Sequence, residues 1–387
     1  MKYSPDQRGP HPVGVKSEIW ADNSRDRNLP VMIWYPARKD YQGKDLNPEF
    51  QDRFVPQWLA VIDPDTEAAT QTAVRDAIPA KINTPLVLSV HGWAGFKEEA
   101  TFVGTHLASH GYTVVSPDVI GSTYADVDAF FTSQEPLGEA QALENHLSGI
   151  CDLRRYDIPF LIDMAAEKLN VDASAVGITG ASFGGWTSLG APEWDERIAA
   201  SVPQCPGGGR SFVLPTNRNV LHHHLNFNWK KPVPTLMVVA DRDSLLPLDG
   251  QLDLLRQIPS EEKSMVILAD ADHNHFVDDI DAGQQWLKEY VERIARIYPN
   301  GPGNWPLAVG LVVPQEELCP GAHAHFALRS LILAHMDAHI RGVQDAAAFL
   351  NGPIDAFMAD HGVATNTLSN CPVHQTDSEG KRQLRVF

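Results

Sequence analysis

The feature that most constrains the fold is a regular alternation of short apolar runs with amphipathic stretches. Residues 84–92 (TPLVLSVHG) form one such run, and its unbroken hydrophobicity is typical of a strand buried on both faces. Residues 97–111 follow with apolar positions at helical spacing and end at a glycine. Further buried strands are expected at 112–118, 174–180, 197–205, 233–241 and 264–273. This alternation predicts an α/β fold, a mostly parallel sheet with helices on both faces.

Other segments complete or interrupt this pattern. Residues 13–36 are β-rich around a turn-prone centre and predict an antiparallel hairpin at the start of the sheet. Residues 325–350 have strong helical periodicity and predict a late, packed helix. Residues 206–230 separate two strands, and we expect them to form a lid or a pocket wall. The tail after residue 360 is polar and is expected to be irregular.

The composition excludes several classes of partner. The formal net charge is −18, which argues against nucleic-acid binding because phosphate contacts need clustered Lys and Arg. The same charge disfavours anionic membrane surfaces. No apolar run reaches the roughly 18 residues of a membrane-spanning helix. The N-terminus is polar without an apolar signal core, so we expect a cytoplasmic protein, or a secreted one whose signal peptide has been removed.

No metal site is expected. The cysteines lie far apart without CxxC spacing, which indicates neither a disulfide nor a paired-cysteine zinc site: Cys151, Cys205, Cys319 and Cys371. Three consecutive histidines at 222–224 cannot all face one ion. His335 and His339 are four residues apart on an expected helix. The glutamate that a metalloprotease helix needs beside the first histidine is missing there, so a helix with surface histidines is the simpler interpretation.

A glycine-flanked serine stands where the strand at 174–180 is expected to end. The stretch Gly180-Ala-Ser182-Phe-Gly184 matches the G-x-S-x-G elbow, in which a serine occupies a strained strand-to-helix turn. The glycines leave room for close neighbours, and the hydroxyl projects into a cleft. Because a five-residue pattern also arises by chance, the interpretation depends on finding a base, an acid and an oxyanion hole elsewhere in the chain.

Several polar residues share the position of this serine at the end of a strand. Ser182, Asp241, Asp243, His273 and the His91–Gly92 pair all fall directly after expected strands. In open α/β sheets, ligands bind beyond the carboxyl ends of the strands. The clustering of these positions at one edge indicates a functional site there.

A serine hydroxyl needs a base to take its proton and an acid to orient that base. The chain order serine, aspartate, histidine is the one expected after such an elbow, and Ser182 is followed by VVADRDSLLP and LADADHNHF. We prefer Asp243 as the acid over Asp241, which is a candidate for capping a turn. We prefer His273 as the base over His275, although both follow the same strand.

The oxyanion formed by attack on a carbonyl needs donors that are already in place, and backbone N–H groups supply them. One donor is expected from Phe183, directly after the nucleophile, and the other from Trp93 in the loop after the first buried strand. We assign His91, Phe96 and Trp186 to substrate binding. The alternative for these aromatic residues is that some belong to the core.

At this point the chain resembles a known family. The segments 85–118, 153–163 and 177–188 resemble the α/β-hydrolase superfamily, and within it the predicted dienelactone hydrolases and bacterial relatives of platelet-activating-factor acetylhydrolase. The opening residues 9–37 and the closing residues 336–350 are similar to that branch too. The resemblance implies an α/β-hydrolase fold, ester hydrolysis and no cofactor.

Position by position, the resemblance supports Ser182, Asp243 and His273 as the triad, with Trp93 and Phe183 as oxyanion donors. It leaves 38–80, 206–230 and 280–318 as variable insertions in one α/β-hydrolase domain over residues 1–387. Dienelactone hydrolases usually carry a cysteine at the nucleophile position, so a serine here points toward a serine esterase.

The expected function is therefore that of a serine-dependent carboxylic-ester hydrolase acting through an acyl-enzyme on a small-molecule or polymeric ester. The alternatives are a polyester or cutinase-like hydrolase, a lactone or amide hydrolase, and a non-catalytic binding protein with the same fold. The pattern of residues specifies neither the acyl and alcohol groups of the substrate nor the oligomeric state.

Overall fold

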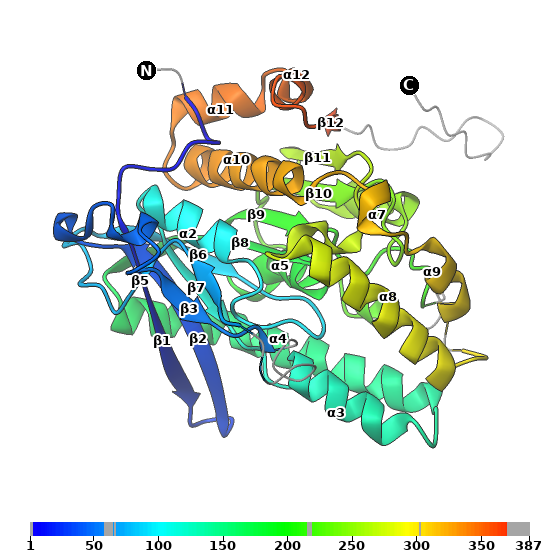
Figure 1. The fold of residues 1–387 in the computed structure, drawn as a ribbon. Coiled ribbons are helices and arrows are strands. Elements are labelled where there is room, and N and C mark those ends of the chain that lie inside the picture. Colours follow the sequence, from blue (N-terminus) through cyan, green and yellow to red (C-terminus); the bar gives the residue numbers. More distant parts are fainter. Residues whose placement is uncertain (1–2, 58–64, 66, 215–218, 302, 370–387) are drawn as a thin grey trace.

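The computed structural model describes residues 3–57, 65, 67–214, 219–301 and 303–369. Its centre is a ten-stranded sheet in the order β12-β11-β10-β9-β8-β6-β7-β2-β1-β5 (Figure 1). The strands are β1 (Val13–Asp22), β2 (Arg27–Pro36), β5 (Val74–Arg75), β6 (Thr84–Ser89), β7 (Thr113–Pro117), β8 (Val171–Ala181), β9 (Ile198–Gln204), β10 (Thr235–Ala240), β11 (Lys263–Leu268) and β12 (Thr365–Ser369). A separate ribbon pairs β3 (Asp52–Phe54) with β4 (Ala69–Gln71).

The middle of the sheet is parallel, as the alternation of strands and helices predicted. Strands β7, β6, β8, β9, β10 and β11 pair with their neighbours in parallel. The N-terminal hairpin of β1 and β2 is confirmed, and β2 joins it to β7 in antiparallel fashion. The parallel strands therefore present their carboxyl ends at one edge, where a ligand site is expected.

Helices cover both faces of this sheet. They are α2 (Thr101–Ser109), α3 (Tyr124–Gln134), α4 (Ala140–Lys168), α5 (Phe183–Trp194), α6 (Val220–His223), α7 (Leu248–Gln257), α8 (Ile280–Ile297), α9 (Trp305–Leu311), α10 (Gly321–His339), α11 (Gln344–Leu350) and α12 (Ile354–Ala359). Short 3₁₀ turns lie at Lys39–Tyr41, Lys44–Leu46, His273–Phe276 and Gln315–Glu317. None of the described helices has the length and apolar character needed to cross a bilayer.

Successive side chains of each strand point to opposite faces of the sheet. On β8, Val176 and Ile178 join the core cluster that contains Ile158 and Leu161 of α4. Gly177 between them faces the other side, where an added Cβ would lie 2.4 Å from the sulfur of Met336 on α10. Helices α4 and α10 therefore cover opposite faces, and both layers can be followed in Figure 1.

The late helix expected at 325–350 is broken into two. Helix α10 ends at His339 and α11 begins at Gln344. Gly342 between them has a positive φ of 65°, a conformation in which glycine carries little steric cost. The apolar periodicity continues across this turn, which is why the sequence pattern alone predicted one element.

The expectation of an irregular tail after residue 360 is wrong for Thr365–Ser369. These residues form β12, which pairs antiparallel with the edge strand β11. Asp355 on α12 accepts hydrogen bonds from the hydroxyls of Thr365 and Thr367, each at 2.7 Å. The polar side chains that suggested disorder are thus tied to α12. Residues 370–387 lie outside the described part of the chain.

The three expected insertions have different outcomes. Residues 38–80 contain 3₁₀ turns and the strands β3, β4 and β5, while residues 58–64 and 66 lie outside the described part of the chain. Residues 206–230, whose described parts are 206–214 and 219–230, contain α6. Residues 280–318 contain α8 and α9. Side chains from the second and third of these segments line the same cavity, which is described below.

Candidate active site

Ser182 occupies a tight turn between β8 and α5. Its backbone has φ 57° and ψ −114°, a conformation that costs energy for any residue with a side chain. The two flanking glycines explain how this turn fits. A Cβ on Gly180 would lie 2.1 Å from the Val90 carbonyl oxygen, and one on Gly184 would lie 1.9 Å from the same atom. The sequence pattern therefore corresponds to a steric requirement.

Asp243 and His273 are hydrogen-bonded to each other beyond the ends of β10 and β11. The Nδ1 atom of His273 lies 2.8 Å from Oδ2 of Asp243. The other carboxylate oxygen of Asp243 accepts hydrogen bonds from the N–H groups of Leu245 and Leu246, at 2.9 and 2.8 Å. Because the carboxylate is held on both sides, it orients the imidazole and leaves Nε2 of His273 available for another partner.

The competing aspartate and histidine are engaged elsewhere. Asp241 is exposed, and its carboxylate accepts a hydrogen bond from the N–H of Ala271. His275 is fully buried, and its ring contacts backbone atoms only at Asp272 and Cys319, apart from a long 3.5 Å contact with Gln315. Asp241 therefore caps a turn, and His275 holds the backbone of two segments together.

Burial and charge act in opposite directions on His273. Burial lowers its pKa, and the neighbouring Asp243 carboxylate raises it through charge and hydrogen bonding. The net effect is a pKa above the usual value, so the environment stabilises the imidazolium. An imidazole that can accept a proton while paired with a carboxylate is equipped for general base chemistry.

Two backbone N–H groups lie on the loops that approach Ser182. Phe183 is the first residue of α5. Trp93 follows Gly92, and a Cβ on Gly92 would lie 3.4 Å from Cβ of Ser182. In the described part of the chain, the N–H groups of Trp93 and Phe183 donate no hydrogen bond. Both are therefore free to bind an external acceptor.

A cavity of about 710 Å³ opens at Ser182 and His273. Residues from 206–230 and 280–318 line it together with the loops after β6 and β8. Its walls include several aromatic side chains: Phe54, Trp93, Phe96, Trp286, Tyr290 and Trp305. The volume is within the range of sites that bury a drug-sized ligand.

Two residues that we assigned to substrate binding are not brought to this cavity. Among the described residues, His91 and Trp186 are absent from its lining, and each is 1% exposed. His91 uses both ring nitrogens on backbone groups of Gly92 and Val119. Trp186 donates from its ring to the carbonyl of Leu221. Both hold neighbouring loops, whereas Phe96 does line the cavity.

One group of described residues could share a metal ion by distance. Ligand atoms of Cys205, Asp243 and His273 lie within 4.8 Å of one another. Burial, followed by the charge of Asp243, raises the pKa of the Cys205 thiol well above its usual range. Because metal binding requires the thiolate, this environment opposes it. The interpretation of His335 as a surface histidine is wrong, since it is buried and hydrogen-bonded through Nε2 to the carbonyl of Pro234.

Comparison with known proteins identifies the family of this chain. The model of the Dienelactone hydrolase family matches residues 73–294, more than half of the 387-residue chain. The chain belongs to the dienelactone hydrolase family. The matched region contains the serine elbow and the Asp243–His273 pair.

Relatives of this dienelactone hydrolase family member include cutinases. Cutinase est1 of Thermobifida alba is 25% identical over 229 residues, which are 56% of this chain and 64% of the relative. The alignment thus spans less than two thirds of that protein. Cutinase 1 of Thermobifida cellulosilytica is 23% identical over 215 residues, 53% of this chain and 68% of the relative.

A solved structure shares the α/β-hydrolase fold of this family member. It is that of a ferulic acid esterase from Streptomyces cinnamoneus, with a TM-score of 0.56 and 22% identity. The superposition covers 86% of this chain and 91% of the esterase.

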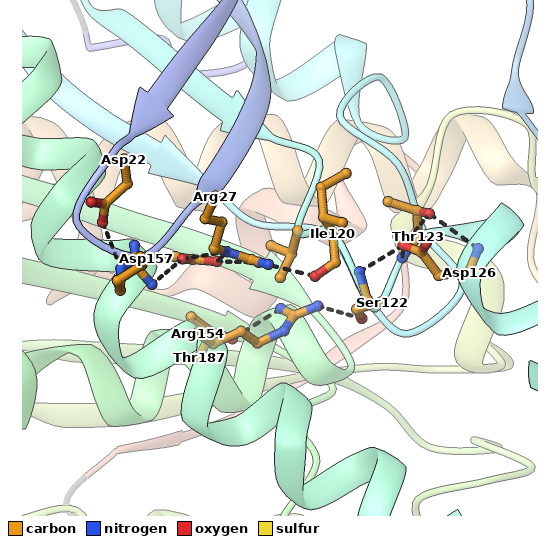
Figure 2. A network of polar contacts seen from close by, with 12 residues as sticks. Asp22, Arg27, Ile120, Ser122, Thr123, Asp126, Arg154, Asp157 and Thr187 are labelled. Atoms are coloured by element: carbon orange, nitrogen blue, oxygen red, sulfur yellow. Dashed lines mark hydrogen bonds and ion pairs between the residues drawn. The ribbon is translucent and has the colours of Figure 1, made fainter.

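Sequence reasoning missed a buried arginine beside the serine elbow. Arg154 lies on α4 and is 0% exposed. It occupies the apolar stripe of the helix, between Ile150 and Ile158, which are both buried. A cation on the apolar stripe of a helix is a signal that the sequence did contain. Figure 2 shows Arg154 bonded to Ser122 and Thr187.

Asp272 is a second residue that sequence reasoning missed. It is 0% exposed, and Oδ1 accepts hydrogen bonds from the N–H groups of Ser244 and His273, at 2.7 and 2.6 Å. Its other oxygen accepts from the amide of Gln284 on α8. Asp272 therefore joins the loop that carries Asp243 to the loop that carries His273. Nothing in the local sequence distinguishes it from the aspartates beside it.

Buried carboxyl groups line the cavity near Ser182. Burial raises the pKa of Glu99 to about 7 and that of Asp278 to about 6. One oxygen of Glu99 accepts a hydrogen bond from the N–H of Gly92 at 2.9 Å. Both oxygens of Asp278 accept from N–H groups at the start of α2, those of Thr101 and Phe102. These acids hold backbone at the cavity wall.

The glycines of the elbow should be intolerant of a side chain. We expect Gly184→Ala to lower the free energy of unfolding by about 1–3 kcal/mol or more, because its Cβ would overlap the Val90 carbonyl. Gly149→Ala is the matched control, since this helical glycine of α4 has open space around its Cβ position. It should stabilise the protein by about 0.5–1 kcal/mol. Denaturant unfolding measures both, and a Gly184→Ala variant as stable as the wild type would contradict the steric argument.

Glu99 should make stability depend on pH. Its pKa rises from 4.5 to about 7 on folding, so the unfolded chain loses this proton first. The contribution of Glu99 is favourable below pH 4.5 and is lost as the pH rises through 7. We therefore expect Glu99→Gln, which keeps an acceptor for Gly92, to raise Tm more at pH 8 than at pH 5. An equal change in Tm at both pH values would show that Glu99 is not protonated in the folded state.

Proposed function

We propose that this protein is a serine-dependent carboxylic-ester hydrolase. The observation that carries the proposal is the hydrogen bond between Asp243 and His273, at the wall of the cavity that also holds the strained Ser182. Membership of the dienelactone hydrolase family and similarity to cutinases support the same chemistry. We propose Ser182 as nucleophile, His273 as base and Asp243 as the acid that orients it.

The proposed reaction uses Nε2 of His273 and the backbone N–H groups that have no partner within the described part of the chain. Because Nδ1 of His273 is bonded to Asp243, Nε2 takes the proton of Ser182 as Oγ attacks the ester carbonyl carbon. The N–H groups of Trp93 and Phe183 bind the oxyanion. The carbon–oxygen bond to the alcohol then breaks, and His273 gives its proton to the leaving alcohol.

Water completes the cycle on the acyl-enzyme. His273 takes a proton from water, and the resulting hydroxide attacks the acyl carbon. The second oxyanion uses the same two N–H groups. When the bond to Ser182 Oγ breaks, His273 returns the proton to the serine, and the carboxylic acid product leaves.

The cavity favours neutral esters. Its described lining contains five carboxylic acids and neither Lys nor Arg: Glu98, Glu99, Asp278, Asp279 and Asp281. Lys97 lies behind this wall and is paired with Glu98 and Asp118. A carboxylate brought into the cavity would meet the carboxylates of Asp279 and Asp281 and, above pH 7, those of Glu99 and Asp278, while the aromatic walls accommodate acyl or aromatic groups. The proposed substrates are therefore uncharged esters. Hydrolysis of a lactone, an amide or a polyester by the same mechanism is the alternative.

The first test is hydrolysis of 4-nitrophenyl esters from acetate to palmitate. We expect turnover by the wild type and a loss of at least about 1,000-fold in kcat for Ser182→Ala, because the nucleophile is removed. The acyl length with the highest kcat/KM measures the depth of the cavity. No turnover of any ester, or equal turnover by Ser182→Ala, would overturn the proposal and favour a binding protein with this fold.

A matched pair of aspartate variants tests the acid. Asp243→Asn should lower kcat strongly and shift the acid limb of the pH–rate profile to lower pH, since the carboxylate raises the pKa of His273. Asp241→Asn removes the same charge from an exposed side chain and should change kcat by less than about threefold. Equal losses in the two variants would contradict the assignment.

The charge of the cavity makes a separate prediction. We expect kcat/KM for mono-4-nitrophenyl adipate to be at least about tenfold lower than for 4-nitrophenyl hexanoate, which has nearly the same length without the terminal carboxylate. A tenfold ratio corresponds to about 1.4 kcal/mol. Added salt should reduce the ratio because it screens the repulsion. Equal kcat/KM for the two esters would show that the acids do not act on the substrate.

A further inference from the structure

We infer that Arg154 is a positioning residue that fixes the peptide between Gly92 and Trp93, so that the N–H of Trp93 points at the oxyanion. This inference rests on the proposed ester hydrolysis. It assigns a role in that reaction to a side chain that does not line the cavity.

The guanidinium of Arg154 holds three separate parts of the chain together. Its Nη1 donates to the carbonyl of His91 at 2.9 Å and to the hydroxyl of Thr187 on α5 at 3.0 Å. Its Nη2 donates to the carbonyl of Gly92 at 3.2 Å and to the hydroxyl of Ser122 at 2.9 Å. Figure 2 shows the contacts with Ser122 and Thr187 on either side of the planar group. A planar fork with fixed donors suits this task better than a flexible ammonium.

The bond to the Gly92 carbonyl acts directly on the proposed oxyanion donor. The C=O of Gly92 and the N–H of Trp93 belong to one planar peptide group, and in the trans form they point in opposite directions. A donor that holds the carbonyl on the Arg154 side therefore turns the N–H of Trp93 the other way. That direction leads to the cavity, which Gly92 and Trp93 both line.

His91 supplies a second hydrogen bond to the same carbonyl. Its Nε2 accepts from the N–H of Val119 at 2.8 Å, so the proton of the neutral ring is on Nδ1. Nδ1 donates to the Gly92 carbonyl at 2.7 Å. Burial, followed by the charge of Arg154, lowers the pKa of His91 to about 3, which keeps the ring neutral and the tautomer constant. Two donors on one carbonyl oxygen leave the peptide little freedom to rotate.

The guanidinium of Arg154 also contacts Phe183, the residue that carries the second proposed oxyanion donor. The guanidinium carbon of Arg154 lies 4.5 Å from the centre of the Phe183 ring. Thr187, which Arg154 holds, donates to the carbonyl of Phe183 at 2.8 Å. Arg154 thus connects the loop of Trp93 with the first turn of α5.

The charge of Arg154 is poorly compensated. In the described part of the chain no carboxylate lies within 4 Å of its nitrogens, and nearby Asp157 is paired with Arg25 and Arg27. Burial lowers the pKa of Arg154 to about 10, so it stays protonated at neutral pH. A buried cation behind both N–H groups adds a positive potential where negative charge develops, and such preorganised electrostatics stabilise transition states.

The experiment compares Arg154→Gln with Arg155→Gln. Arg155 is the next residue on α4, half-exposed and paired with Glu193, so its variant controls for loss of charge on this helix. Competent sites are counted by titration with a fluorophosphonate, and kcat is expressed per titrated site. We expect kcat per site to fall about 10- to 1,000-fold in Arg154→Gln with KM changed less than about threefold. Arg155→Gln should keep the wild-type kcat.

A purely structural role predicts a different result. It would lower the number of titrated sites or Tm and leave kcat per site within threefold of the wild type, which would overturn the inference. If Arg154→Gln does not fold, Arg154→Lys provides the test, since it keeps the charge but not the fork, and kcat per site should fall at least about fivefold. The affinity of a phenylboronic acid, which forms an anionic tetrahedral adduct with serine, should fall by the same factor as kcat.

The proposed function and this inference fail separately. A wild type that hydrolyses no ester overturns the proposed function and the inference with it. A wild type that hydrolyses esters through Ser182, beside an Arg154→Gln variant with unchanged kcat per site, overturns the inference alone.

Discussion

The contact on which this site depends is the close approach of the Val90 carbonyl to the turn that carries Ser182. The oxygen of Val90 lies where a Cβ of Gly180 or Gly184 would be. Strands β6 and β8 are neighbours in the parallel sheet, and their ends meet at this point. The absence of two side chains therefore lets the loop after β6 lie against the serine elbow, and both proposed oxyanion donors come from these two segments.

Around this contact, polar side chains hold the loops that form the site. Asp272 bonds the backbone of the Asp243 loop and of the His273 loop. Glu99 accepts from Gly92, and Arg154 donates to the carbonyls on either side of that N–H. Each of these groups costs desolvation energy, which its hydrogen bonds to the loops offset. Such networks keep loops at a site in one arrangement.

The cavity walls come largely from segments outside this frame. The aromatic residues Trp286, Tyr290 and Trp305 belong to 280–318, while other wall residues belong to 206–230. The frame of the serine elbow, the proposed acid and the proposed base comes from the ends of the parallel strands. This division separates the residues that we propose for the reaction from most of those that shape the cavity.

The sequence by itself determined the N-terminal hairpin and the run of parallel strands, the position of the serine elbow and the short stretches that hold the proposed acid and base. These features are local, since periodicity and glycine spacing act over a few residues. Only the tertiary structure showed that Asp243 and His273 are hydrogen-bonded while Asp241 and His275 have other partners, because these contacts depend on which side chains meet beyond the ends of β10 and β11. It also moved His91 and Trp186 from the cavity into its supporting frame and turned Thr365–Ser369 into an edge strand. Arg154 acts on groups 62 and 63 residues away in the chain. Contacts of that range depend on how the sheet brings distant segments together, and no local pattern encodes them.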